Sequence, residues 1–201
     1  NIKKLNTGDI VLCHGSDIGD SPIDKAIEYA THSPWVHAGI IIRDPFDSIN
    51  GCKIQLKGLY ILQSGAGPNG YPDVIDGITQ GVTLNRLDEF LQNRVKIYIM
   101  TLNNVLWDDK NKKKFYEIFK TVHGKPYDKK WYHWCIVGIT SFLNCECFAR
   151  KIIPREKYEY WCSALVAYIY CNMDWIDDND DWTCDTPSDI IKWQLINGKY
   201  L

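Results

Sequence analysis

The stretch HAGIIIR, residues 37–43, is a short apolar run dominated by β-branched side chains. Such a run predicts a strand in the middle of a sheet, because it is too short to form a helix. Residues 7–13 (TGDIVLC) and residues 95–102 (VKIYIMTL) carry the same strand pattern. Residues 53–64 end in a fourth run of this kind, LYILQS. These patterns predict that the first half of the chain builds a sheet.

Helical patterns dominate the second half of the sequence. Residues 108–122 place apolar side chains on one face and lysines on the other, and residues 162–173 (CSALVAYIYCNM) are predicted to form a buried helix. Strands followed by helices predict the α+β class, with an antiparallel sheet packed against helices. Further helices are expected over residues 23–31, 87–91 and 134–149 and from Thr186 onward, with a turn-rich insert at 44–51 and a long loop at 65–81.

The composition fits a single domain covering residues 1–201 and excludes several classes of protein. The 23 Lys and Arg residues against 25 Asp and Glu residues give a net charge of −2, which argues against a nucleic-acid binder with a basic face. No apolar run reaches the roughly 18 residues that a transmembrane helix needs. A chain of this length does not need its eight cysteines as disulfides, so we expect a reduced, intracellular protein. A secreted, disulfide-bonded protein is the alternative.

Cys162 stands where a thiol is suited to chemistry. It follows a polar loop and opens the apolar helical run, so its thiol is expected in the first helical turn. The unpaired N–H groups and the positive end of the helix dipole favour the nucleophilic thiolate there, and the same N–H groups can hold an oxyanion. The alternative is a buried structural cysteine, as we expect for Cys171.

A thiol nucleophile needs a base, and His37 is the best placed of the five histidines. It opens the central strand directly after the Ser33-Pro34-Trp35 turn, where a rigid scaffold can hold an imidazole at the rim of a cleft. His14 and His32 are alternative neighbours of the site. His123 and His133 are expected at helix ends as ordinary, partly exposed residues.

Gln63 is a candidate for the group that orients the imidazole. It lies near the end of the 53–64 strand and would stand beside His37 if the two strands pair. Its carbonyl oxygen can accept a hydrogen bond from the ring N–H, although a neutral amide stabilises imidazolium less than a carboxylate does. Ser64 would then point to the other face of the sheet.

Four motifs follow one another in a fixed order along the chain, with the histidine before the cysteine. They are residues 8–12 (GDIVL), 33–40 (SPWVHAGI), 124–128 (GKPYD) and 161–166 (WCSALV). In these motifs the sequence resembles the circularly permuted papain-like enzymes of the NlpC/P60 superfamily, and within it the YiiX-like hydrolases and their poxvirus relatives. The resemblance extends over about residues 7–192, with Gly81-Val82 and residues 186–189 (TPSD) also fitting.

The resemblance implies a circularly permuted papain-like fold and a cysteine-dependent hydrolase or acyltransferase. Such an enzyme cleaves an amide or ester bond through an acyl-enzyme intermediate and needs no cofactor. The resemblance places the nucleophile at Cys162, the base at His37 and the third residue at Gln63, where YiiX-like members usually have Glu. This departure leaves two hypotheses open: a working Cys-His-Gln site, or a catalytically silent module that binds a peptide or lipid in the same cleft.

The substrate is expected to be a peptide, a lipopeptide or an acyl lipid. The resemblance points to a bacterium or a large DNA virus, and hence to the cytoplasm of a bacterium or of an infected cell, or to a virion. The lysines at 110 and 112–114 are interpreted as a solvated helix face, with a peripheral contact to anionic lipid headgroups as the alternative. The sequence does not indicate the oligomeric state.

No metal site is predicted from the sequence. Cys145 and Cys147 are spaced more closely than the usual pair of zinc ligands. The acidic loop at residues 174–181 lacks the Gly and the terminal Glu of a calcium-binding loop.

Overall fold

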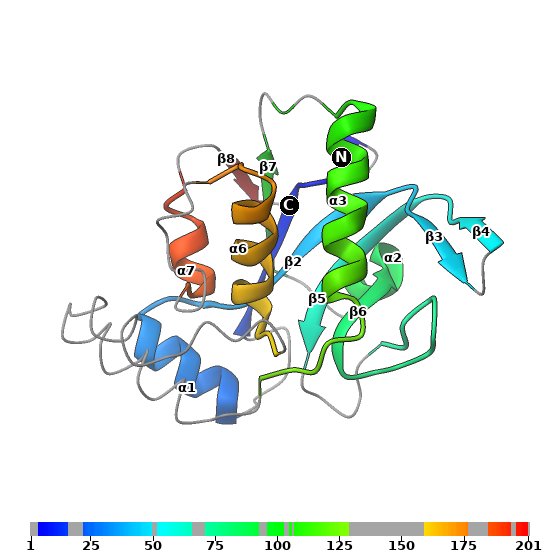
Figure 1. Cartoon of the computed structure of the whole chain (residues 1–201). Helices are drawn as coiled ribbons and strands as arrows, with labels where there is room; N and C mark the ends of the chain where they lie inside the picture. Colours follow the sequence, from blue (N-terminus) through cyan, green and yellow to red (C-terminus); the bar gives the residue numbers. More distant parts are fainter. Residues whose placement is uncertain are drawn as a thin grey trace.

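The computed structural model of the protein describes residues 4–15, 22–49, 52–65, 71–92, 96–102, 105, 107–128, 159–176, 185–193 and 196–200. In this part of the chain the main sheet has six strands in the order β6-β5-β2-β1-β7-β8, each antiparallel to its neighbours (Figure 1). These strands are β1 (Ile10–His14), β2 (Trp35–Arg43), β5 (Leu59–Gly65), β6 (Gly81–Arg86), β7 (Ile97–Leu102) and β8 (Ile196–Tyr200). The HAGIIIR stretch forms most of β2, a central strand as predicted.

The described helices are α1 (Pro22–Thr31), α2 (Leu87–Leu91), α3 (Asp109–Val122), α6 (Cys162–Asn172) and α7 (Pro187–Ile190). A search of the described residues finds no helix that is both long enough and apolar enough to span a membrane.

Side chains of the main sheet alternate between two apolar layers. On one face Ile40 and Leu62 belong to a cluster that includes residues 164–171 of α6. On the other face Ile41 and Ile61 pack with Phe90 of α2. Because successive residues of a strand point to opposite faces, each polar residue in β2, β5 or β6 belongs to a definite side of the sheet.

β2 has an extra residue directly before His37. Cys13 of β1 pairs with His37, but the next residue of β1, His14, pairs with Trp35. Val36 therefore has no counterpart in β1, and the strand is bulged at this point. Bulges locally redirect side chains and are common beside active sites.

α6 is buried along its length, from Cys162 to Cys171. This burial explains why its sequence is apolar on all sides instead of amphipathic. α6 lies in front of the sheet in Figure 1, and its first turn lies toward the end of the sheet where β5 finishes.

Three strand segments differ from the sequence-based expectations. β6 was not predicted, because GVTLNR contains glycine and polar residues and no continuous apolar run. The turn-rich insert expected at 44–51 contributes β3 (Phe46–Ile49), which pairs with β4 (Cys52–Gln55) in a separate hairpin.

The chain also differs from expectation at its C-terminal end. α7 begins at the predicted Thr186-Pro187 signal but is only four residues long, and β8 follows it. The helix predicted over residues 134–149 lies outside the described residues.

Candidate active site

His37 and Gln63 lie side by side on the sheet. β2 and β5 pair in antiparallel fashion with Gly39 opposite Gln63, which confirms the strand pairing that the sequence analysis required. The Nε2 atom of His37 lies 2.6 Å from Oε1 of Gln63. The imidazole ring also packs near Phe90, with 6.0 Å between the ring centroids. Both side chains therefore belong to the face that α2 covers, and Ser64, as predicted, uses the other face to donate a hydrogen bond to Tyr160.

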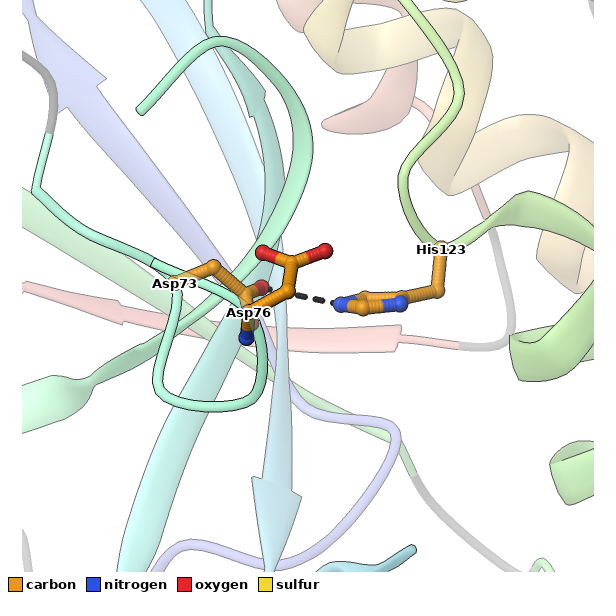
Figure 2. Close-up of side chains that lie close together, drawn as sticks. All are labelled: Asp73, Asp76 and His123. Carbon is orange, nitrogen blue, oxygen red and sulfur yellow. Dashed lines mark hydrogen bonds and ion pairs between the residues drawn. The ribbon is translucent and has the colours of Figure 1, made fainter. Parts of the chain in front are cut away.

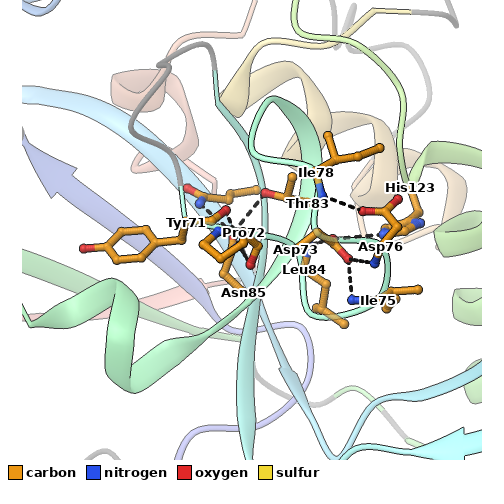
Figure 3. A network of polar contacts seen from close by, with 11 residues as sticks. Tyr71, Pro72, Asp73, Ile75, Asp76, Ile78, Thr83, Leu84, Asn85 and His123 are labelled. Carbon is orange, nitrogen blue, oxygen red and sulfur yellow. Dashed lines mark hydrogen bonds and ion pairs between the residues drawn. The ribbon is translucent and has the colours of Figure 1, made fainter.

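Gln63 is held by a buried polar residue of β6 that the sequence analysis did not identify. The Nε2 atom of Gln63 donates to Oδ1 of Asn85 at 2.8 Å, and Thr83 Oγ1 donates to the same oxygen at 2.9 Å. The amide nitrogen of Asn85 donates to the backbone carbonyls of Tyr71 and Pro72, at 2.9 and 3.0 Å (Figure 3). Asn85 is fully buried, so its four hydrogen bonds lie in a region of low dielectric constant.

Cys162 is the first residue of α6, as predicted. Its N-cap, Trp161, makes no side-chain capping hydrogen bond, so the cap leaves the N–H groups of the first turn to other partners. The Sγ atom lies 3.8 Å from the carbonyl oxygen of Val36, the bulged residue that precedes His37. The side chain is buried, with 2% of its surface exposed. The fold thus brings the thiol to within one residue of His37 along β2.

Backbone hydrogen bonds hold the start of β6 against the segment that follows α3. Val82 donates to the carbonyl of Lys125 at 2.8 Å, and Gly124 donates back to Val82 at 3.0 Å. Gly81 has a φ of +87°, and a Cβ atom there would overlap the Lys125 carbonyl oxygen. The GKPYD motif therefore serves at least to anchor β6.

His123 is more than the ordinary helix-end residue expected from the sequence. It follows α3, and its Nε2 atom lies 3.0 Å from Oδ2 of Asp73, whose side chain is 1% exposed (Figure 2). The same carboxylate accepts the N–H groups of Ile75 and Leu84. Burial favours a higher pKa for Asp73, but these hydrogen bonds outweigh it and lower the pKa below its ordinary value of 3.8.

Asp73, Asp76 and His123 are also a group of side chains of the types that bind metal ions, with ligand atoms within 4.8 Å of one another. The N–H groups of Ile75 and Leu84 already occupy both oxygens of Asp73, so hydrogen bonding alone accounts for its burial. Cys145, Cys147 and residues 177–181 of the acidic loop lie outside the described residues. Two of the four lysines of the predicted basic patch form ion pairs, Lys112 with Asp109 and Lys114 with Asp174.

Comparisons with known proteins identify the class. Residues 4–135 match the family model of the permuted papain-like amidase enzymes, the YaeF/YiiX, C92 family, and the chain belongs to this family. The matched region contains His37 and Gln63 and ends before Cys162.

One solved structure extends the likeness over the whole fold. It is the crystal structure of the metalloprotein yiiX from Escherichia coli O157:H7, with a TM-score of 0.57 and 15% sequence identity, covering 98% of this chain and 97% of that one. Among curated proteins, no sequence is significantly similar to the chain. The α+β, permuted papain-like fold expected from the sequence is thereby confirmed.

Proposed function

We propose that the protein is a cysteine amide hydrolase in which Cys162 is the nucleophile, His37 the base and Gln63 the residue that orients His37. The observation that carries this proposal is the placement of the Cys162 thiol against Val36, at the bulge that precedes the hydrogen-bonded His37–Gln63 pair. Membership of an amidase family supports an amide as the bond that is cleaved.

The position of the bulge matters, because α6 and α2 cover opposite faces of the sheet. A thiol at the start of α6 meets an imidazole on the α2 side only around the N-terminal end of β2, where Val36 and His37 lie. The extra residue at Val36 locally turns the strand at that point, which supports a pairing of the two groups there.

In the proposed reaction, His37 takes the proton of Cys162 and the thiolate attacks the carbonyl carbon of the substrate. The oxyanion accepts hydrogen bonds from N–H groups of the first turn of α6, including that of Cys162. The C–N bond then breaks, the leaving amine takes the proton from the imidazolium, and the acyl group remains on sulfur as a thioester. Water, activated by His37, hydrolyses the thioester and restores the thiol. An ester substrate or another acyl acceptor would follow the same steps.

The substrate class is a peptide, a lipopeptide or an acyl lipid, all of which present a carbonyl that this chemistry attacks. A thiolate that reacts with such carbonyls also reacts with iodoacetamide, which tests the nucleophile without a known substrate.

The test is to treat the folded protein briefly with iodoacetamide near pH 6 and to locate the label by peptide mass spectrometry. Cys171 is the matched control, because it is a cysteine of the same helix with 4% of its surface exposed. We expect Cys162 to be labelled at least about tenfold faster than Cys171, and Cys162→Ser to lose this reactivity together with amide hydrolysis. Equal, slow labelling of the two cysteines would overturn the proposal and favour a catalytically silent binding module.

A further inference from the structure

We propose that Asn85 is a positioning residue that sets the protonation of the His37 ring through Gln63; this inference rests on the proposed function. The hydrogen bonds from Asn85 to His37 form one continuous chain. At each bond, only one assignment of donor and acceptor satisfies both groups. Figure 3 labels Tyr71, Pro72 and Asn85 of this chain.

This series of hydrogen bonds starts at two backbone carbonyls, which can only accept. Tyr71 and Pro72 present oxygens that only accept, so the Asn85 atom facing them must be the amide nitrogen. Oδ1 of Asn85 then faces Gln63 and only accepts. A rotated Asn85 amide would put an oxygen against two carbonyl oxygens in a fully buried site, at a large cost.

The orientation of the Asn85 amide fixes the orientation of the Gln63 amide. Because Oδ1 of Asn85 only accepts, the Gln63 atom that faces it must be the amide nitrogen, at 2.8 Å. Oε1 of Gln63 is thereby turned toward His37 and accepts from Nε2 at 2.6 Å. Neutral His37 therefore carries its proton on Nε2, and Nδ1 is the nitrogen with the lone pair that takes a proton from a thiol.

The same chain favours the imidazolium form. When His37 becomes charged, Nε2 still donates to Gln63, and the hydrogen bond becomes stronger because its donor is charged. A Gln63 amide free to rotate would spend part of its time with its nitrogen facing the ring, which opposes the charged form. Asn85 thus supports the thiolate–imidazolium pair without touching the reacting atoms.

Thr83 provides a matched control. Its hydroxyl donates to the same Oδ1 atom of Asn85, and its side chain is also buried. Thr83 lies opposite Gln63 in the β5–β6 pair, but its hydroxyl is not part of the hydrogen bond from Gln63 to Asn85. Thr83→Val removes a buried hydrogen bond to Asn85 while the link from Asn85 to Gln63 remains. A purely structural role of this network predicts that reactivity falls in proportion to the loss of stability in both variants, with no change in the His37 tautomer.

The experiment combines nitrogen-15 NMR of the His37 ring with the pH profile of Cys162 alkylation by iodoacetamide. At high pH, where the His37 ring is neutral, we expect the Nε2–H tautomer in the wild type and in Thr83→Val, and a mixture of tautomers in Asn85→Ala. We also expect Asn85→Ala to slow alkylation near pH 6 by about tenfold and to shift the profile to higher pH by about one unit, with little change in Thr83→Val.

The outcomes separate the two proposals. Fast alkylation of Cys162 in the wild type, with an unchanged profile and tautomer in Asn85→Ala, overturns the role of Asn85 and leaves the proposed function intact. Slow alkylation in the wild type itself overturns the proposed function. If Asn85→Ala does not fold, the wild-type spectrum at high pH still decides, because an Nδ1–H tautomer of the neutral ring contradicts these donor and acceptor assignments directly.

Discussion

Gln63 connects His37, the proposed base, to the interior of the protein, so its amide has two separable effects. Replacing it with Ala removes the acceptor for His37 but leaves Asn85 Oδ1 with the hydroxyl of Thr83. We therefore expect Gln63→Ala to lower amide turnover or Cys162 alkylation by about tenfold or more, and the free energy of unfolding by only about 1 kcal/mol. Urea unfolding measured beside the reaction rate checks both. An unchanged rate would mean that another residue orients His37.

Gln63→Glu tests the match between Gln63 and its surroundings. A carboxylate at this position would face Oδ1 of Asn85, which the Tyr71 and Pro72 carbonyls hold as an acceptor. We expect the free energy of unfolding to fall by about 2 kcal/mol at neutral pH, because two acceptors would oppose each other in a buried site. Urea unfolding at pH 7 measures the change. A variant as stable as the wild type would contradict the expected opposition of the two acceptors.

The residues of the candidate site differ in how far the sequence identifies them. His37, Gln63 and Cys162 stand at recognisable points, the start of a strand, the end of a strand and the start of a helix. Asn85 lies in a segment without an apolar run. Its role depends on contacts with Tyr71 and Gln63, which lie 14 and 22 positions away in the sequence. Such contacts follow from the tertiary fold, which single-sequence patterns do not contain.

At the scale of elements, the junction between β6 and the segment after α3 depends on Gly81. Gly81 and Gly77 both have positive φ angles, of +87° and +76°, but only Gly81 lies against backbone. We expect Gly81→Ala to lower the free energy of unfolding by about 3 kcal/mol, since it adds overlap with Lys125 to backbone strain. Gly77→Ala is the control and should cost about 1 kcal/mol. Equal losses in urea unfolding would contradict the proposed packing of this junction.

The elements that the sequence predicted well are those with strong apolar patterns. Four elements agree with their predicted ranges to within about two residues at each end: β2, β7, α3 and α6. β6 and β8 were missed, because GVTLNR and INGKY contain glycine and polar residues and gain their regular structure by pairing with β5 and β7. Pairing with a neighbour, more than local propensity, decides whether such segments become strands.

For the whole molecule, Asp73 joins the 71–78 loop, β6 and the end of α3 through a single buried carboxylate. Its pKa in the folded protein is below the ordinary value of 3.8, so its contribution to stability is present above about pH 4 and is lost as the pH falls through the folded pKa. Asp73→Asn puts an amide N–H against a backbone N–H, and it should lower the free energy of unfolding by about 2 kcal/mol at pH 7.

The difference between wild type and Asp73→Asn should shrink below pH 4, where the wild type loses the same interaction. Urea unfolding at a series of pH values between 3 and 7 measures it. A difference that is constant over this range would show that the Asp73 carboxylate does not titrate as the structure implies.

The fold brings together chain segments that are far apart in sequence. Cys162 and Val36 are separated by 126 positions, and the family match ends before Cys162 is reached. The candidate site therefore exists only when α6 packs against β2. In the proposed enzyme, this packing pairs the Cys162 thiol with the His37 imidazole.

The most direct test is the pH profile of iodoacetamide alkylation at Cys162 in the wild type and in His37→Ala. We expect wild-type Cys162 to keep its reactivity well below pH 7, because imidazolium stabilises the thiolate. In His37→Ala the profile should move toward the ordinary thiol pKa of about 8.5, with a loss of reactivity near pH 6 of at least about tenfold. Superimposable profiles for the two proteins would contradict the pairing of Cys162 with His37.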